Sequence, residues 1–417
     1  MSEGVETVGL DTPPRLAVDR LLDDRETRII VCCGAGGVGK TTTAAALGVR
    51  AAGRGRKAVV LTIDPARRLA QSMGIDSLDN TPRRVEVAGE GGGELHAMML
   101  DMKRTFDEIV EAHADAERAR AILANPFYQS LSAGFAGTQE YMAMEKLGQL
   151  RARDDWDLII VDTPPSRSAL DFLDAPKRLG SFLDGKFIRV LMAPAKVGGR
   201  AGMKFLNVGM SMMTGTLSKL MGASLLKDVQ TFVAAMDTMF GGFRTRADAT
   251  FRLLQAPGTA FLVVAAPEPD ALREAAYFVE RLAEERMPLA GLVLNRVHAS
   301  GADQLSAERA LAAAENLEEG GIVDQESGKA GLRDTAAEPP GADDDTTAVD
   351  RITAGLLRLH AERMQVIARE QRTRDRFTSL HPEVAVTEVA ALPGDVHDLA
   401  GLRAIGERLA AGVPAGA

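Results

Sequence analysis

The segment VCCGAGGVGKTTTAAA, residues 31–46, decides the fold of this chain. An apolar run leads into closely spaced glycines, which are followed by a lysine, three threonines and alanines typical of a helix. Glycines let consecutive backbone N–H groups curl round a phosphate, and the N-terminus of the following helix adds positive potential. From Gly34 to Thr41 the spacing is that of a phosphate loop, in which Lys40 neutralises β- and γ-phosphate oxygens and the Thr41 hydroxyl binds Mg²⁺.

The same glycines also fit a rival motif. Gly34, Gly36 and Gly39 match the dinucleotide fingerprint, and Asp64 stands about where that fold places a ribose-binding acid. A dinucleotide site, however, has no need of a Lys-Thr pair directly after the third glycine. Asp162 also follows an apolar run, as a Walker B carboxylate that orients magnesium-bound water would. The sequence therefore predicts a site for a nucleoside triphosphate with Mg²⁺.

The remainder of the chain predicts an α/β fold. Apolar runs without polar alternation are typical of parallel strands that are covered by helices on both faces. Helical stretches lie between them, which indicates a mostly parallel, doubly wound sheet. We expect the strands at residues 28–33, 58–63, 95–100, 158–161, 260–266, 291–295 and 383–390.

Two kinds of segment interrupt this alternation. We expect a polar lead-in at 1–27 and one domain at 28–417. Helical periodicity without strands at about 101–150 and 175–250 predicts an α-helical subdomain inserted into the sheet domain. Residues 300–348 are rich in Ala, Glu, Asp and Gly, a composition that buries little apolar surface. We expect an acidic, partly disordered surface insertion there.

Composition narrows the class of protein. The 417 residues carry a net charge of −9, which argues against a chain that mainly grips nucleic acid or an acidic membrane. The two cysteines, Cys32 and Cys33, are adjacent, so they offer neither a disulfide framework nor zinc-ligand spacing. The N-terminus lacks a signal-peptide pattern, and the uncharged run at 205–218 is too short to span a membrane. We expect a cytoplasmic protein with no integral membrane segment and no nucleic-acid partner.

Three segments together resemble a known family: GGVGKT in the phosphate loop, Asp-Pro-Ala at 64–66 and Asp-Thr-Pro-Pro-Ser at 162–166. They are similar to the ArsA/guided-entry (GET pathway) ATPases, P-loop ATPases of the deviant Walker A group that act as dimers. The resemblance covers the chain apart from 1–27 and 300–348, and it is strongest to actinobacterial members that occur as a pair of paralogues. It implies an ATP hydrolase that uses ATP and Mg²⁺.

The resemblance also implies roles for individual residues. Asp64 would be the switch I acid that acts on the attacking water, and Asp162 the switch II acid that senses the γ-phosphate through Mg²⁺. Asn295 resembles an adenine-reading asparagine, the loop around Pro393 would cover the adenine, and Glu268 would reach the nucleotide of the partner. The nucleotide-binding loop would comprise Gly34, Gly36, Gly37, Val38, Gly39, Lys40, Thr41 and Thr42.

Simpler interpretations remain open for two of these residues. Asp64 precedes a proline, so an Asx turn is an alternative. Asn295 could be a turn residue at the end of a strand.

The chain departs from the family pattern in three ways. It lacks the cysteines with which arsenite-pump members bind metalloid, so a thiol-based metalloid site is disfavoured. The CxxC zinc pair of eukaryotic members is missing as well. Ala35 occupies the position of the signature lysine, which reaches the phosphates of the other subunit. We therefore expect a heterodimer with a paralogue that keeps this lysine, or a homodimer in which Arg67 or Arg68 replaces it.

Eight of the seventeen methionines lie between residues 192 and 239. They indicate either a gap-filling helical core or an adaptable apolar surface, and the resemblance implies a groove for hydrophobic client helices. The predicted function is a Mg²⁺-dependent ATPase whose dimer opens and closes, coupling hydrolysis to a hydrophobic protein client. The alternative is a ParA/MinD-like regulatory or positioning ATPase. Against it, the stretch at 399–417 carries little of the positive charge expected of a membrane anchor.

Overall fold

The computed structural model describes residues 14–64, 68–87, 91–132, 138–164, 242, 245–319 and 342–412. Within them, one eight-stranded sheet has the order β3-β4-β2-β5-β1-β6-β7-β8. All neighbouring strands are parallel except β3, which runs antiparallel to β4. The strands are β1 (Ile29–Cys33), β2 (Lys57–Thr62), β3 (Arg83–Val85), β4 (Glu94–Met99), β5 (Leu158–Asp162), β6 (Thr259–Ala265), β7 (Leu289–Val297) and β8 (Val386–Ala390). The predicted mostly parallel α/β sheet is confirmed.

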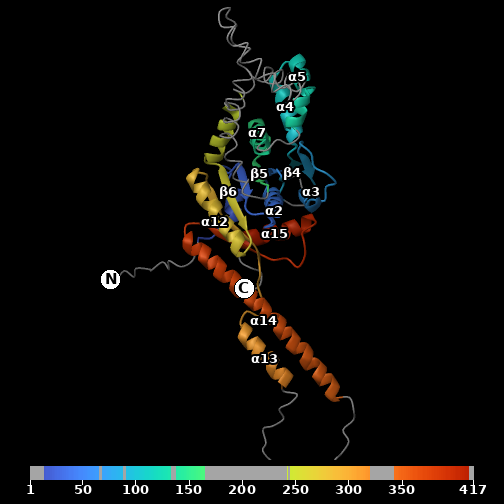
Figure 1. Cartoon of the computed structure of the whole chain (residues 1–417), viewed down its shortest axis with the longest axis vertical. Helices are drawn as coiled ribbons and strands as arrows, with labels where there is room; N and C mark the ends of the chain where they lie inside the picture. The colour runs from blue at the N-terminus through green and yellow to red at the C-terminus, as the bar shows by residue number, and fades with distance from the viewer. Residues whose placement is uncertain are drawn as a thin grey trace, which may run out of the picture.

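Helices cover both faces of the sheet (Figure 1). The described helices include α1 (Val18–Asp23), which precedes β1, then α2 (Lys40–Gly53), α3 (Arg68–Ser72), α4 (Met102–His113), α5 (Ala116–Leu123), α6 (Pro126–Ser132), α7 (Thr138–Arg153), α12 (Pro269–Glu284), α13 (Ala307–Glu319) and α14 (Ala342–Leu380), and α15 (Leu399–Ala411), which follows β8. None of the described helices is long and apolar enough to cross a membrane.

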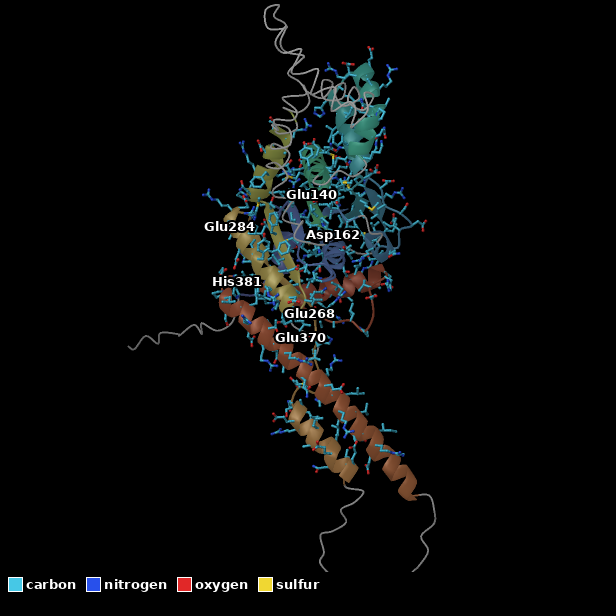
Figure 2. The ribbon with its side chains drawn as sticks, in the orientation of Figure 1. Glu140, Asp162, Glu268, Glu284, Glu370 and His381 are labelled. Atoms are coloured by element: carbon cyan, nitrogen blue, oxygen red, sulfur yellow. The ribbon has the colours of Figure 1, made fainter. Side chains whose placement is uncertain are left out.

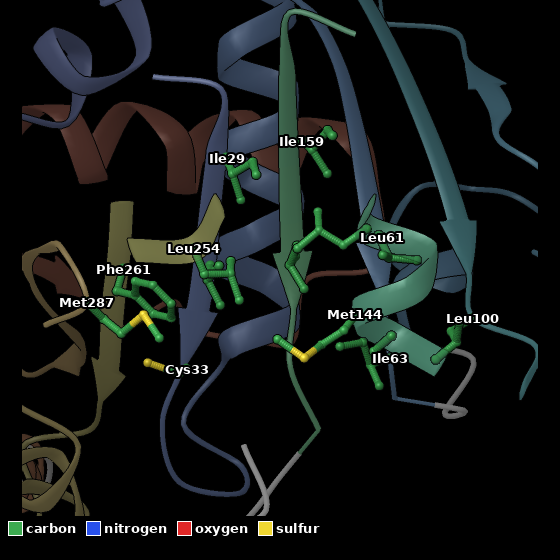
Figure 3. Close-up of a cluster of buried hydrophobic side chains, with 14 of the residues drawn as sticks. Ile29, Cys33, Leu61, Ile63, Leu100, Met144, Ile159, Leu254, Phe261 and Met287 are labelled. Atoms are coloured by element: carbon green, nitrogen blue, oxygen red, sulfur yellow. The ribbon is translucent and has the colours of Figure 1, made fainter. Parts of the chain in front are cut away.

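The burial of strand β1 on both faces explains why its sequence is apolar at every position. Ile29, Val31 and Cys33 belong to the core cluster on one face of the sheet, whereas Ile30 and Cys32 belong to the cluster on the other. Figure 3 shows the first cluster, in which Ile29 and Cys33 lie with side chains from neighbouring strands and helices. Burial on both faces therefore requires apolar residues at every position of such a strand.

The last described helix, α15, packs beside α2, the helix that follows the phosphate loop. Leu402, Ile405 and Leu409 of α15 are buried, and α15 packs along α2. Asp398 caps the helix by accepting a hydrogen bond from the Gly401 N–H at 2.7 Å. The apolar face of α15 is therefore part of the core.

The described part of the predicted lead-in, residues 14–27, is anchored in the domain. Leu16, Val18 and Leu22 are buried, and they pack with the core cluster on the α2 side. Arg56 is fully buried, and its guanidinium donates to backbone carbonyls of this segment and to the carbonyl of Asp157. The segment that the sequence predicts to be a polar lead-in thus contains a short helix, α1, with an apolar face.

The two predicted interruptions are partly described. Helices α4 to α7 occupy the predicted helical region at 101–150, and α7 contributes to the core beneath the sheet. Of the second predicted helical region, 175–250, only 242 and 245–250 are among the described residues, so the Met-rich stretch at 192–239 lies outside them.

Parts of the 300–348 segment, for which the sequence predicts an acidic, partly disordered insertion, are helical. Residues 307–319 form α13 and residues from 342 onward begin α14, while 320–341 lie outside the described residues. Alanines make this packing possible, because Ala310 and Ala314 of α13 and Ala354 and Ala361 of α14 are fully buried. The α13–α14 hairpin extends away from the sheet (Figure 1).

Candidate functional site

A cavity of about 350 Å³ opens at the carboxyl ends of the central strands. Its wall includes the phosphate loop, Asp64 after β2 and Thr163 after β5. Arg296 from β7 and residues 395–397 from the loop after β8 complete the wall on the other side. This edge is where parallel α/β sheets place their ligands.

Glycines are required at two positions of the loop between β1 and α2. Gly34 has φ +146°, and a Cβ there would lie 2.1 Å from the Val264 carbonyl oxygen. Gly39 has φ +97°, and a Cβ there would lie 2.2 Å from Asn295 Nδ2. Gly37 also has positive φ, but a Cβ there would meet no atom within 4 Å. At both ends, therefore, another group approaches the loop backbone too closely for a side chain to fit.

Lys40 begins α2 and is folded onto its own loop. Its ammonium donates to the carbonyl oxygens of Gly34 at 3.0 Å and Ala35 at 2.7 Å. Burial lowers the pKa of this lysine, while the nearby carboxylate of Asp162 opposes that shift. An ammonium has three N–H donors, so one remains for a phosphate oxygen.

Asp162 ends β5 and is completely buried at the centre of the fold (Figure 2). Its Oδ2 accepts hydrogen bonds from the hydroxyls of Thr41 and Thr62, each at 2.8 Å. Its Oδ1 is buried and has no hydrogen-bond partner among the described residues. Burial raises the pKa of Asp162 to about 6, against the lowering effect of the two hydroxyls.

This donor set fits Mg²⁺. A carboxylate and a threonine hydroxyl are hard oxygen ligands, and Mg²⁺ is usually held by one or two carboxylates, water and substrate phosphates. Within the described residues no group of three or more His, Cys, Asp or Glu side chains could form a metal cage by itself. The unpartnered Oδ1 of Asp162 and the Thr41 hydroxyl are therefore the groups suited to such an ion or its water.

Thr62 links the two acids of the site. Its hydroxyl donates to Asp162 Oδ2, and the same oxygen accepts the backbone N–H of Asp64 at 3.2 Å. From the opposite side, Gln139 of α7 donates to the Ile63 carbonyl at 2.9 Å. The segment that carries Asp64 is thus held between β5 and α7.

The structure brings some of the predicted residues together and separates others. Lys40, Thr41, Asp64 and Asp162 lie around the loop, with Gly37, Gly39 and Thr42 in the cavity wall. Asn295 is buried beneath the loop, where its Nδ2 donates to the Val38 carbonyl at 2.8 Å.

Two predicted residues do not line the cavity. Pro393 is absent from its wall, although Asp395 and His397 of the same loop are present. Glu268 is exposed before α12 and lines a separate groove between α12 and α14, together with Glu370 (Figure 2).

Sequence reasoning missed several residues of this site, among them Thr62, Arg296 and His397. Thr62 lies two positions before Asp64, on the strand whose end carries the acid, which is a usable signal. Arg296 has φ +63° and sits where the β7–β8 register shifts, a conformation that no short motif predicts. His397 lies in a loop without periodicity. Of the two arginines proposed to replace the signature lysine, Arg68 lines the cavity and Arg67 lies outside the described residues.

Comparison with known proteins adds to this geometry. A relative named ATPase GET3, from Malassezia globosa, is 31% identical over 173 residues, which are 42% of this chain and 49% of that protein. ATPase GET3 from Podospora anserina is 25% identical over 280 residues, 66% of this chain and 75% of that protein. ATPase BagA from Mycobacterium tuberculosis is 29% identical over 168 residues, 38% of this chain and 48% of that protein.

The chain thus spans about half the length of two of these relatives and three quarters of the third. The sequence model described as anion-transporting ATPase, ArsA ATPase, matches residues 27–319. That range includes the whole phosphate loop, both acids of the cavity and Asn295. The chain belongs to the ArsA family of P-loop ATPases.

Proposed function

We propose that this protein binds ATP with Mg²⁺ at the cavity between the phosphate loop and Asp64, and hydrolyses it. The observation that carries the proposal is the buried carboxylate of Asp162. Its Oδ2 is fixed by Thr41 and Thr62, while its Oδ1 has no partner among the described residues. A buried acceptor that is left open beside a phosphate loop is suited to a ligand.

The chain's own groups would divide the work. Backbone N–H groups of the loop and the Lys40 ammonium would hold the phosphates and stabilise developing charge. Thr41 and Asp162 would hold Mg²⁺, which when bound neutralises phosphate charge. Asp64 lines the same cavity and would orient the attacking water and accept its proton.

Two substitutions test this division. Lys40→Ala is expected to abolish ATP binding, because the lysine contacts phosphate oxygens in the ground state. Asp64→Asn is expected to leave ATP affinity largely intact and to stop turnover. Calorimetric binding and phosphate release on both variants are the measurements. Hydrolysis by Asp64→Asn at the wild-type rate would remove Asp64 from the mechanism.

We also propose that hydrolysis is coupled, through opening and closing of a dimer, to a hydrophobic protein client. The support is the family resemblance together with the Met-rich composition of 192–239, which lies outside the described residues. Hydrogen exchange with and without ATP tests it. If the amides of this region are uniformly protected from exchange, and ATP does not change that protection, the region is ordinary core and not a client-binding surface.

Ala35 suggests that the dimer includes a paralogue that carries the signature lysine. A homodimer of this chain would lack that charge at both sites. A charge supplied in trans at such a site can be worth ~10³–10⁵ in rate, as for an arginine finger. In a heterodimer, the lysine of the paralogue would serve the site on this chain's phosphate loop. Arg68 in the cavity is the competing candidate for this role within a homodimer.

The test compares this chain alone, with the paralogue, and as Ala35→Lys. Ala35→Met is the matched control, because it adds a similar stem without a charge at a position that is 9% exposed. We expect weak ATPase activity alone, stimulation by the paralogue, and a gain with lysine but not with methionine. Robust activity of the chain alone, unchanged by the paralogue, would contradict the proposal.

The ParA/MinD-like alternative is not favoured. The match to the ArsA ATPase family model and to relatives named ATPase GET3 supports the first reading over it.

A further inference from the structure

Arg296 has a left-handed backbone conformation inside a strand. Three described residues other than glycine have a positive φ: Asp154 at 52°, Arg286 at 55° and Arg296 at 63°. Asp154 directly follows α7 and Arg286 lies just beyond the end of α12, and a left-handed residue is common where a helix ends. Arg296 instead lies within β7, where this conformation is strained for an arginine and would suit a glycine.

A β-bulge in β7 accompanies this conformation. The pairing of β7 with β8 passes from Asn295 to Val297 and leaves Arg296 as the extra residue. Leu292, Leu294 and Val297 belong to one core cluster, so in a strand without the bulge position 296 would face that core. The bulge instead leaves Arg296 exposed, and the residue lines the cavity beside the phosphate loop.

The guanidinium of Arg296 is available to a ligand. Within the described part of the chain it makes no hydrogen bond or ion pair. A guanidinium has both a positive charge and a planar face, so it can bind a phosphate oxygen or stack on a nucleobase. Its place in the cavity decides between these two roles.

The order of the strands places Arg296 at the nucleoside end of the cavity. In the sheet, β5 and β2 lie on one side of β1, and β7 and β8 lie on the other. Asp162 at the end of β5 and Thr41 are the groups suited to Mg²⁺, so the β- and γ-phosphates would lie on the β5 side. A nucleotide that extends from there across the loop presents its base to Arg296 of β7 and His397 of the loop after β8.

We propose that Arg296 binds the nucleobase by stacking its guanidinium on the face of the ring, so that purines bind more tightly than pyrimidines. The inference rests on the proposed ATP site and names a residue that holds the base of its substrate. A purine offers a larger π-face than a pyrimidine, whereas adenine and guanine offer similar ones. The strained bulge is then explained by the nucleotide affinity that it provides.

Equilibrium binding of ATP, CTP and inorganic tripolyphosphate to the full-length protein tests this contact. Arg296→Ala is expected to weaken ATP binding about tenfold and CTP binding less. Tripolyphosphate has no base, so its affinity should not change. Arg296→Lys should restore ATP affinity only in part, because an ammonium has the charge but not the planar face.

A glycine at the same position separates binding from strain. Arg296→Gly removes the strain together with the side chain, so it should raise the melting temperature of the nucleotide-free protein and weaken ATP binding as Arg296→Ala does. Arg286→Gly is the matched control, because Arg286 has a similar φ but does not line the cavity. This control should raise the melting temperature and leave ATP affinity unchanged.

Four outcomes would overturn the inference. If Arg296→Ala binds ATP as tightly as the wild type does, Arg296 has no role in a site that is otherwise intact. Weaker tripolyphosphate binding by that variant assigns the arginine to a phosphate. A fall in both melting temperature and ATP affinity in Arg296→Gly shows that Arg296 supports the fold. A wild-type protein that binds neither ATP nor tripolyphosphate removes the proposed function, and this inference with it.

Discussion

The phosphate-loop site and the α13–α14 hairpin differ in which groups they leave without partners. At the site, Lys40 and Asp162 are buried and held by hydrogen bonds, and one buried oxygen, Asp162 Oδ1, remains open. On the hairpin, five large apolar side chains of α14 are more than half exposed. An open polar atom in a buried setting indicates a small ligand, whereas an open apolar stripe indicates another chain.

The largest expected effect concerns the loop backbone. Gly34→Ala would put a Cβ 2.1 Å from the Val264 carbonyl oxygen, a contact that only backbone movement can relieve. We expect a loss of about 3 kcal/mol or more in the free energy of unfolding and loss of ATP binding. Denaturant titration and calorimetry measure the two effects.

Gly37→Ala is the matched control for this substitution. Its φ of +78° is also unfavourable, but no atom lies within 4 Å of the added carbon. We expect a cost of about 1–2 kcal/mol from backbone strain alone. Equal losses in the two variants would show that φ, and not the contact with β6, sets the requirement for glycine.

The next effect concerns Thr62, which bridges Asp162 and the backbone of Asp64. Thr62→Val keeps the side-chain shape but removes a hydrogen bond to a charged acceptor, which is worth about 1.5–3 kcal/mol. If the bridge aligns the site for hydrolysis, kcat falls roughly ten- to hundredfold. ATP affinity should change much less, and steady-state kinetics with direct binding separates the two.

Thr62→Ser retains the hydroxyl and should restore most of the activity. A Thr62→Val protein that loses ATP affinity and kcat in equal measure would indicate that Thr62 only supports the fold.

A smaller effect is expected at Asn295, for which the sequence left two roles open, adenine recognition and a turn at the end of a strand. Its Nδ2 donates to the Val38 carbonyl beneath the loop. Asn295→Ala should therefore cost about 1 kcal/mol of stability and lower ATP and GTP affinity by a similar factor. Competition binding with both nucleotides measures this. A loss confined to ATP would assign Asn295 to adenine recognition instead.

The smallest effect is expected on the hairpin. Arg358 and Glu318 form an ion pair at 2.5 Å between α14 and α13, but their side chains are 50% and 39% exposed. Arg358→Ala should change the free energy of unfolding by no more than about 0.5 kcal/mol, because water and salt screen such pairs.

The buried alanines provide the contrast within the hairpin. Ala361→Leu adds volume where α14 meets α13 and should cost about 1–3 kcal/mol. Hydrogen exchange of the α13 amides would show the difference. A larger effect from Arg358→Ala than from Ala361→Leu would mean that charge, not close packing, holds the hairpin.

The same contrast explains what the sequence could predict. The long central strands were predictable because burial on both faces forces apolar residues at consecutive positions, as in β1. The three-residue β3 was missed, since Arg83 and Arg84 give it no apolar run. Helix α13 was missed because alanines, which bury little surface each, make close contacts between helices that composition does not show.

The residues of the site divide in the same way, into those that a local pattern predicts and those that only the fold brings together. Lys40 and Thr41 were predictable because the phosphate-loop motif fixes their spacing, and Asp162 because it ends an apolar strand. Arg296 comes from β7 and His397 from the loop after β8, so they line one cavity only in the folded chain. Their positions depend on the β7 register shift and on the loop after β8, which no local pattern encodes.

Because α15 packs on α2, the order in which the ribosome makes the chain affects how long part of α2 stays exposed. The phosphate loop and α2 leave the ribosome early, yet the helix that covers α2 comes more than 340 residues later, at 399–411. The strands on either side of β1 are also distant in sequence, at 158–162 and 259–265. Until α15 emerges, the side of α2 that it covers is exposed, so the nascent chain presents a surface on which chaperones act.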